Sequence, residues 1–470
     1  MNLKIKLSFL GAAGNVAGSR FLLEANGTRI LIDCGLYQER ELTGRNWEPF
    51  PVPPHTINAV LLTHAHVDHC GLLPRLVRNG FRGKVYCTEA TAEIAQIVIL
   101  DSAHLQEEDA EFKKRRHQRE KRRGPFPEIP LFTVADANAS FPLFSPLKYG
   151  QVVQIGDGIK VDFHDAGHVL GSSMVRITVT QGDERRMIVF SGDVGRWDKP
   201  ILNDPSLFTE VDYVLIESTY GDRLHQDTPD ISDSLADIVN TTWKAGGNII
   251  IPSFALQRSQ EVLYYLDKLL IDDRIPHLMV FIDSPMAAKI TEVFRRHSEL
   301  FDAEMLNLIA HYRSPFDFPG LKMVQTVDES KSINHIKGTV IVIAGSGMCT
   351  GGRIKHHLVT NISRPESTIL FVGYQAVGTL GRQIIDGVQR VRILGQHYDV
   401  KARIAQLGGL SSHADREGLF RWLSALNRGP RRVFVVHGEP EATESFGELI
   451  RKDKGWNVSV PGYKDEVMLD

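Results

Sequence analysis

The hydrophobic positions of the first 200 residues form short runs separated by polar or glycine-rich turns. Residues 159–163 alternate apolar and polar side chains, whereas 57–63 and 187–190 are almost continuously apolar. Alternation is typical of a half-buried strand, and a short apolar run is typical of a fully buried one. This part of the chain is therefore expected to be rich in strands, with helices near 71–79 and 89–112.

Between about 211 and 390 the pattern changes to strand-like runs followed by helical segments or glycine-rich turns. Four apolar runs mark the expected strands, at 248–252, 277–282, 339–344 and 368–372. Repeated strand–helix units favour a parallel sheet covered by helices. The simplest organisation is one domain formed by residues 1–208 and 393–470, interrupted by an inserted α/β domain at 209–392.

The most unusual string is His-Ala-His-Val-Asp-His at 64–69, directly after the apolar run 57–63. Only about 10⁻³ strings of this form are expected by chance in a chain of this composition. Imidazole and carboxylate groups suit zinc, so the string indicates a metal site on a strand-to-helix loop; a polar turn is the alternative. Six residues cannot surround two ions, so a dinuclear site needs further ligands.

Further candidate ligands stand at the ends of other apolar runs. They are His168, Asp193 and His437. Taken singly, a polar residue after a strand is more often a hydrogen-bonded group than a ligand. Their order along the chain favours the metal hypothesis.

In this order the motifs resemble those of the metallo-β-lactamase superfamily over nearly the whole chain. The first four motifs correspond to 31–35, 64–69, His168 and Asp193. Three later strings narrow the resemblance to the β-CASP nucleases, at 216–221, 410–415 and 435–439. The nearest likeness is to the branch of the pre-mRNA 3′-end-processing endonuclease and its bacterial and archaeal relatives. A histidine in the last motif, here His437, accompanies the RNA-processing members.

This resemblance implies an αββα sandwich with an inserted β-CASP cap, and an active site in the cleft between them. It also implies two zinc ions with a bridging hydroxide that attacks phosphorus. The resemblance places His64, His66 and His168 on one zinc ion, Asp68, His69 and His437 on the other, and Asp193 between them.

The resemblance also suggests roles for four acidic and imidazole groups. Asp68 would orient or deprotonate the nucleophile, and Asp33 would fix the tautomer of a ligand histidine. His413 would protonate the leaving 3′ oxygen, with Glu217 holding it in the imidazolium form. From the residues alone, Asp33 and Glu217 could equally cap the ends of strands.

Two glycine-rich strings resemble the segments of the cap that face RNA. The string at 345–353 contains Ser346, Gly347 and Arg353, and backbone N–H groups at a helix start can hold a phosphate. Glycines needed only for a tight turn are the alternative. The string at 373–382 offers Tyr374 for stacking on a base and Arg382 for a phosphate.

A third signal is the basic run at 113–123, which holds eight Lys or Arg residues and one acidic residue. Such a run attracts a polyanion in a salt-dependent way. It directly follows an acidic stretch at 107–111, so a solvated helix face or flexible loop is an equal alternative.

Composition adds few constraints. The 470 residues suggest two or three domains, and a net charge of −3 gives no general sign of nucleic-acid binding. Four cysteines without a CxxC pair indicate reduced thiols, and the chain shows no signal peptide and no long apolar run. These features predict a cytoplasmic protein with no membrane partner, and they leave the oligomeric state open, a homodimer included.

We therefore expect a zinc-dependent ribonuclease that hydrolyses phosphodiester bonds of single-stranded RNA. Endonucleolytic cleavage is favoured, with 5′→3′ exonuclease activity as an addition. A small-molecule hydrolase of the same fold and a catalytically silent RNA-binding scaffold are the alternatives. The complete set of motifs and the large inserted domain argue against both.

Overall fold

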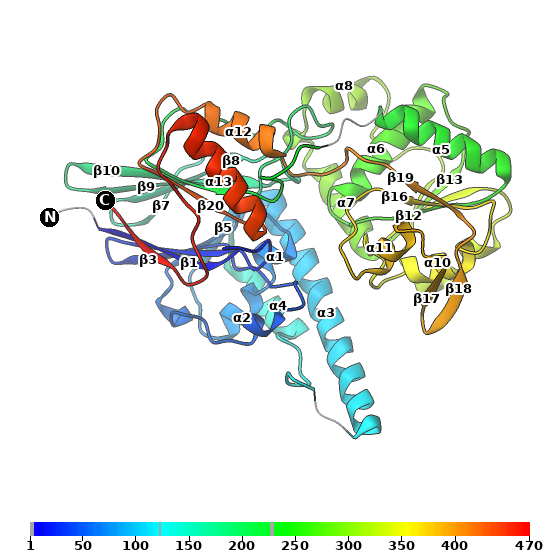
Figure 1. Cartoon of the computed structure of the whole chain (residues 1–470), viewed down its shortest axis with the longest axis horizontal. Helices are drawn as coiled ribbons and strands as arrows, with labels where there is room; N and C mark the ends of the chain where they lie inside the picture. The colour runs from blue at the N-terminus through cyan, green and yellow to red at the C-terminus, as the bar shows by residue number, and fades with distance from the viewer. Residues whose placement is uncertain (1–3, 122–123, 226–229) are drawn as a thin grey trace. The chain divides into compact units, whose positions relative to one another are not determined.

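The computed structural model describes residues 4–121, 124–225 and 230–470 (Figure 1). The chain divides into two compact units, each described here by itself. The first unit consists of 1–198, 204–224 and 413–470, and the second consists of 199–203 and 225–412.

The first unit contains two seven-stranded sheets. One sheet has the strand order β22 (Glu466–Leu469), β1 (Ile5–Gly11), β2 (Arg20–Ala25), β3 (Thr28–Ile32), β4 (Ala59–Leu61), β5 (Lys84–Thr88) and β6 (Phe144–Leu147). The other has the order β21 (Val458–Ser459), β20 (Arg432–Val436), β11 (Tyr213–Glu217), β10 (Glu184–Phe190), β9 (Ser173–Gln181), β8 (Ile159–Asp165) and β7 (Val153–Gly156).

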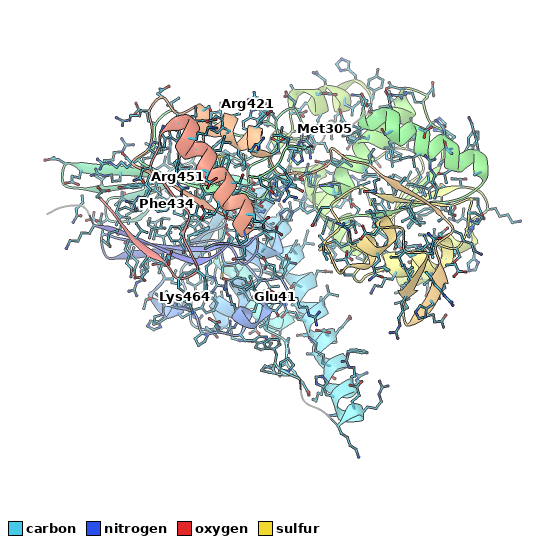
Figure 2. All side chains as sticks on the ribbon, in the orientation of Figure 1. Glu41, Met305, Arg421, Phe434, Arg451 and Lys464 are labelled. Atoms are coloured by element: carbon cyan, nitrogen blue, oxygen red, sulfur yellow. The ribbon has the colours of Figure 1, made fainter. Side chains whose placement is uncertain are left out.

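The two sheets pack face to face around one apolar core. Phe9 of β1 meets Phe434 of β20, which Figure 2 labels, with ring centroids 5.3 Å apart. Phe21 of β2 and Phe190 of β10 lie 6.2 Å apart in the same layer. The apolar runs that predicted strands therefore supply the inner faces of both sheets.

Helices cover the outer faces of this sandwich. On the first sheet they are α1 (Val67–Cys70), α2 (Leu73–Arg78), α3 (Glu89–Glu120) and α4 (Val134–Ser140). On the second sheet, Trp422 of α12 (Arg416–Ser424) and Phe446 of α13 (Pro440–Lys454) pack on the side chains of β11 and β20. The layers are visible in Figure 1 and confirm the expected αββα order.

The second unit is built on a six-stranded parallel sheet. Its strand order is β14 (Leu321–Met323), β13 (Met279–Asp283), β15 (Val340–Ala344), β12 (Ile249–Pro252), β16 (Thr368–Phe371) and β19 (Arg403–Gln406). Its helices are α5 (Ile231–Ala245), α6 (Arg258–Ile271), α7 (Pro285–Arg296), α8 (Ala303–His311), α9 (Val327–Ser332), α10 (Ile354–Asn361) and α11 (Leu380–Ile385).

One face of this sheet packs against α10, α11 and the hairpin of β17 (Arg390–Ile393) and β18 (Gln396–Asp399). Figure 1 shows α5 and α6 on the opposite face. The expected parallel sheet flanked by helices is confirmed.

The boundaries of the units differ from those predicted at 208/209 and 392/393. The first unit continues to residue 224 because β11 pairs with β10 and β20 in its second sheet. The second unit continues to residue 412 because β19 pairs with β16 at the edge of the parallel sheet. Across the described ranges, no helix combines the length and apolarity needed to cross a lipid bilayer.

Candidate metal centre

The predicted metal ligands come together in the first unit, each in a segment that follows a strand. His64, His66, Asp68 and His69 lie between β4 and the end of α1, and the others follow β8, β10 and β20. The backbone brings the loops close: Cys34 N–H donates to the His69 carbonyl at 2.7 Å, and Ser19 N–H donates to the Asp68 carbonyl at 2.8 Å. At this approach Gly35 has no room for a side chain, since a Cβ there would lie 1.6 Å from the Asp68 carbonyl oxygen.

The first donor set consists of His64, His66, His168 and Asp193. His66 Nδ1 lies 3.0 Å from His64 Nε2 and 3.3 Å from His168 Nε2. Asp193 Oδ2 lies 3.4 Å from His64 Nε2 and 3.5 Å from His168 Nε2. Three imidazole nitrogens and one carboxylate oxygen therefore face a common point.

The second donor set consists of Asp68, His69 and His437, joined by the other oxygen of Asp193. The two Nε2 atoms of His69 and His437 are 3.2 Å apart, and Asp193 Oδ1 lies 3.3 Å and 3.6 Å from them. Asp68 Oδ2 lies 3.5 Å from His437 Nε2 and 3.7 Å from His69 Nε2. Asp193 thus offers one oxygen to each set.

These spacings fit tetrahedral metal coordination. Ligand atoms about 2.0–2.1 Å from a zinc ion at tetrahedral angles are separated from one another by about 3.3 Å. The donor–donor distances are 3.0–3.5 Å in the first set and 3.2–3.7 Å in the second. Imidazole and carboxylate donors are also the chemistry that zinc prefers. The residues present therefore fit two metal ions.

In the first set the protonation states suit the same purpose, whereas in the second set metal binding displaces protons. Burial lowers the pKa values of His69 and His437, but Asp193 outweighs burial and raises both above the ordinary histidine value. Burial lowers the pKa of His64 well below its ordinary value and lowers that of His66 to about 4, so both rings are neutral near pH 7, as ligation requires. Burial raises the pKa of Asp193, but His437 and His69 outweigh this effect and hold the pKa well below its usual range. The shared carboxylate is therefore ionised.

Asp33 and Thr63 support the second set from behind. Asp33 Oδ2 lies 2.7 Å from His69 Nδ1, an arrangement that keeps the proton on Nδ1 and leaves the Nε2 lone pair facing the donor set. Thr63 donates from its backbone N–H and its hydroxyl to Asp33, at 2.8 Å and 2.9 Å. Its hydroxyl also lies 3.1 Å from His64 Nδ1.

Thr63 and Thr219 were not predicted as site residues. The Thr219 hydroxyl lies 3.3 Å from His437 Nδ1. The only sequence signal for either residue is its position beside a motif: Thr63 precedes the string 64–69, and Thr219 lies within 216–221.

His413 and Glu217 form a hydrogen-bonded pair at the edge of the centre. His413 Nδ1 lies 3.0 Å from Glu217 Oε1, and its Nε2 faces Asp193 Oδ2 at 3.9 Å. Glu217 is fully buried and accepts the Val194 N–H at 2.7 Å. Burial lowers the pKa of His413, but Glu217 and then Asp193 outweigh it and raise the pKa to about 9.

The predicted RNA-binding residues lie in the second unit, on loops at the carboxyl edge of the parallel sheet. The Ser346 hydroxyl accepts the N–H groups of Thr350 and Gly351, at 3.0 Å and 3.2 Å, and so shapes its own loop. Gly347 lies under the ring of Phe254, where a Cβ would come within 2.9 Å of ring carbons. Phe254 is 44% exposed and was not predicted from the sequence.

The two arginines of these loops are bonded differently. Arg353 donates to buried Asp283 at 2.7 Å and to the Gln325 carbonyl at 2.8 Å, so its guanidinium neutralises an internal carboxylate. Arg382 lies on the surface and pairs with Asp386, one turn along α11, at 2.9 Å. Tyr374 is 58% exposed and free to contact a ligand ring.

Of the basic run, residues 113–120 extend α3 beyond its predicted end at 112 and Lys121 is its C-cap, whereas Arg122 and Arg123 lie outside the described residues. Charged side chains one turn apart stabilise this extension, as in the pair of Lys113 with Asp109 at 2.5 Å.

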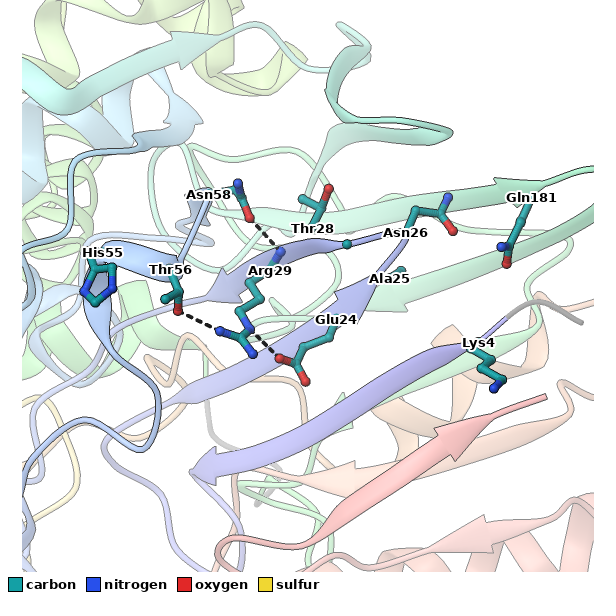
Figure 3. Close-up of a pocket in the computed structure, with 11 residues that line it drawn as sticks. Lys4, Glu24, Ala25, Asn26, Thr28, Arg29, His55, Thr56, Asn58 and Gln181 are labelled. Carbon is teal, nitrogen blue, oxygen red and sulfur yellow. Dashed lines mark hydrogen bonds and ion pairs between the residues drawn. The ribbon is translucent and has the colours of Figure 1, made fainter. Parts of the chain in front are cut away.

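A separate surface pocket, drawn in Figure 3, lies at the other end of the first sheet. The pocket surrounds the β2–β3 turn and Asn58, which lie at the starts of β3 and β4. The site residues Asp33 and His64 lie after the opposite ends of these two strands. One of its two cationic side chains, Arg29, is already bonded to Glu24 at 2.5 Å and to Thr56 at 2.9 Å. This pocket holds none of the metal donors.

Comparison with known proteins gives matches along most of the chain. Residues 22–217 match the metallo-beta-lactamase superfamily domain, 259–384 the Beta-Casp domain, and 397–461 the Zn-dependent metallo-hydrolase RNA specificity domain.

Two relatives align over nearly the whole chain. Ribonuclease TTHA0252 of Thermus thermophilus is 39% identical over 457 residues, which cover 97% of this chain and 98% of that protein. Transcription termination factor FttA of Methanosarcina mazei is 31% identical over 460 residues, covering 95% of this chain and 69% of that protein. A crystal structure of a protein of unknown function from Enterococcus faecalis shares the fold, with a TM-score of 0.58 and 13% identity over 99% of this chain and 100% of that one.

Proposed function

The chain belongs to the β-CASP ribonuclease family of the metallo-β-lactamase superfamily, and on this premise we propose that it is a zinc-dependent ribonuclease that cleaves single-stranded RNA. The observation that carries the proposal is the pair of tetrahedral donor sets that share Asp193. A two-metal phosphodiesterase holds its ions close together, and one carboxylate with an oxygen in each set provides that spacing.

His64, His66 and His168 would hold one zinc ion, and Asp68, His69 and His437 the other, with Asp193 common to both. When bound, such ions act as Lewis acids on phosphate oxygens and lower the pKa of a bound water toward about 7. Asp33 and Thr63 keep the His69 ring turned with Nε2 toward the centre. Asp68, whose side chain is 19% exposed, accepts a hydrogen bond from the attacking water and orients it.

His413 supplies the proton for the leaving group. Its Nδ1 is held by Glu217, so the second proton of the imidazolium lies on Nε2, the atom that faces the donor sets. As the bond between phosphorus and the 3′ oxygen breaks, this proton passes to the oxygen. The products are a 3′-hydroxyl end and a 5′-phosphate end.

Of the predicted RNA-binding residues, Tyr374 and Arg382 are the best exposed: Tyr374 for stacking on a base and Arg382 for a phosphate. The loop that holds Ser346 and Gly347 contributes its backbone. Arg353 supports this loop through Asp283. We propose endonucleolytic cleavage with 5′→3′ exonuclease activity in addition, in a cytoplasmic protein; its four cysteines, all buried and unpaired, agree with a reducing compartment.

The proposal is tested with RNA labelled at the 5′ end or the 3′ end, incubated with the zinc-loaded protein and with the chelator-stripped protein. Internal cuts that appear only in the loaded sample, with 3′-hydroxyl ends, are expected. If the protein releases only single nucleotides and makes no internal cuts, the proposed endonuclease activity is wrong. Cleavage that survives complete metal removal would overturn the mechanism.

A matched pair of variants tests the proton donor. Glu217→Gln keeps the size of the side chain but removes the charge that holds the imidazolium, so it should slow cleavage less than His413→Ala does. Both proteins should retain two zinc ions. Loss of zinc from His413→Ala would show that His413 supports the metal site instead.

A further inference from the structure

The outer half of α3 leaves the body of the first unit. Buried residues of this helix occur regularly from Ala90 to Ala103, and from His104 to its end only Ala110 is buried. We refer to residues 104–121 as the arm. At a rise of about 1.5 Å per residue, the arm carries its last residues about 26 Å beyond Ala103. Figure 1 shows this end of α3 extending past the other helices of the unit.

One face of the arm is held in place by the segment that follows it. Gln106 Oε1 accepts the Leu131 N–H at 3.0 Å, and Glu107 Oε1 accepts the Val134 N–H at 2.9 Å. Nearer the tip, His117 Nδ1 lies 2.5 Å from Glu128 Oε1. These three anchors are spread over twelve residues and hold the arm as a supported helix.

The opposite face of the arm is exposed and carries a distinct set of side chains. Positions 105, 112, 116 and 119 lie along one side of a helix, since they differ by multiples close to 3.6. Leu105 is 59% exposed and Phe112 is 62% exposed. Arg115, Arg116 and Arg119 follow on the same side within two turns of Phe112, and all three are exposed. An exposed aromatic ring therefore lies beside three guanidinium groups.

Internal ion pairs leave most of this charge available. Arg115 meets Glu111 only at 3.9 Å with an 80% exposed side chain, and Arg116 meets Glu120 at 3.4 Å. Exposed pairs of this kind stabilise a helix only weakly, so a phosphate readily replaces the acidic partner. Residues 113–121 contain six basic residues and one acidic residue, a local net charge of +5.

A second copy of the chain fits this face poorly. Pairing of two helices needs apolar side chains at two positions in every seven. The exposed side of the arm offers only Leu105 and Phe112, with charged residues at 108, 109, 116 and 119. Arginine beside an exposed aromatic ring is instead typical of contacts with single-stranded nucleic acid.

We propose that the arm is a second RNA-binding surface, used only by RNA that extends beyond the catalytic centre. Arg115, Arg116 and Arg119 contact phosphates, and Phe112 stacks on an unpaired base. The inference rests on the proposed ribonuclease function, because it assigns an additional contact to the same substrate.

The test compares binding of a 40-nucleotide unstructured RNA by proteins that carry the slowing change His413→Ala, so that RNA stays intact. In the test variant Arg115, Arg116 and Arg119 are changed to Gln. The matched control removes the same charge at exposed sites elsewhere on the unit, with Lys148, Lys160 and Lys452 changed to Gln. Each phosphate contact to a single strand contributes about 0.7 to the slope of log K against log salt, so the slope should fall by about 2 in the test variant. The control should leave it unchanged.

Phe112→Ala should weaken binding of the long RNA about five- to tenfold without changing the salt slope, because stacking releases no counterions. Neither arm variant, made without the His413 change, should alter kcat/KM for a short oligonucleotide that occupies only the catalytic centre, since the proposed arm contact is used only by RNA that extends beyond it.

An unchanged slope in the arginine variant, or an equal fall in the control, overturns the proposal. A fall in sedimentation mass on changing Phe112 also overturns it, because the face would then join two copies of the chain. Failure of the wild-type protein to cut either RNA would instead count against the proposed function, and the binding comparison would still decide the role of the arm.

Discussion

Changing Asp33 to Asn should weaken metal binding at the second donor set much more than at the first. Asp33 is 1% exposed and contacts the second set only through His69 Nδ1, at 2.7 Å. Asn has nearly the same size and still accepts the Thr63 N–H, so the fold has little reason to change. It lacks the negative charge that keeps the proton on Nδ1 and makes Nε2 a better ligand.

The size of the effect follows from this single contact. Loss of such a partner typically lowers metal affinity about 10- to 100-fold, equal to about 1.4–2.7 kcal/mol. The first set meets the second through Asp193, and its His64 touches Thr63 rather than Asp33. Because Asp33 contacts the first set only indirectly, through Thr63, the first set should lose much less affinity than the second.

Zinc titration against a chromophoric chelator measures the two affinities separately. Wild-type protein should bind two ions, and Asp33→Asn should bind one of them about 10- to 100-fold more weakly. Asp162→Asn is the control, because Asp162 is also a buried carboxylate bound to a histidine, His164, at 3.0 Å, but lies outside both sets. Equal weakening of both sites, no weakening, or the same loss in the control would refute the reasoning.

Four further changes give sharp outcomes. Asp193→Ala should remove the oxygen shared by both sets, abolish cleavage and lower the zinc content measured by elemental analysis, while the circular dichroism spectrum stays native. His413→Ala should lower kcat by about 10²–10⁴ with zinc content unchanged. Arg382→Ala should lower kcat/KM for short and long RNA alike without altering thermal stability. Arg353→Ala should lower kcat/KM as well, and it should also lower the free energy of unfolding by about 1–3 kcal/mol because the buried carboxylate of Asp283 loses a partner. Burial raises the pKa of Asp283, but its hydrogen bonds outweigh burial and lower the pKa. The stabilisation from these bonds is therefore present above the unfolded pKa of about 4 and is lost as the pH falls below that value. Thermal melts at pH 7 and pH 3 should therefore differ less for Arg353→Ala than for wild type.

The layers of the fold follow closely from the sequence, but the borders of its units do not. The apolar run of β11 indicates a buried strand, yet a buried strand has the same pattern in either sheet, and the short, half-exposed β19 has no apolar run at all. Which sheet accepts it depends on hydrogen bonds to distant strands, such as Glu217 of β11 beside Val436 of β20. Pairing across more than 200 residues leaves no local signal.

The site likewise contains residues that the sequence predicts and residues that it does not. The string 64–69 stands out because so dense a group of histidines and an aspartate is not expected by chance, and the family resemblance supplies the grouping with His168, Asp193 and His437. Thr63 has no such mark, because a threonine at the end of a strand is ordinary. Its contact with Asp33 exists only because β3 and β4 run parallel and end side by side.

Positive charge in the sequence has opposite outcomes at Arg353 and on the arm of α3. Arg353 follows a glycine-rich turn, where a phosphate contact is a reasonable expectation, but a carboxylate 70 residues away occupies its guanidinium. The arginines of the arm looked equally suited to a plain solvated helix, and their neighbours one turn away do bind them. The difference lies in the burial of the acidic partner. Asp283 is fully buried, so it would be left as an unpaired buried charge if Arg353 moved away. The acidic partners on α3 are exposed, and water solvates them when an arginine moves away. Only the second kind of arginine remains available to a phosphate, and no property of the sequence alone distinguishes the two.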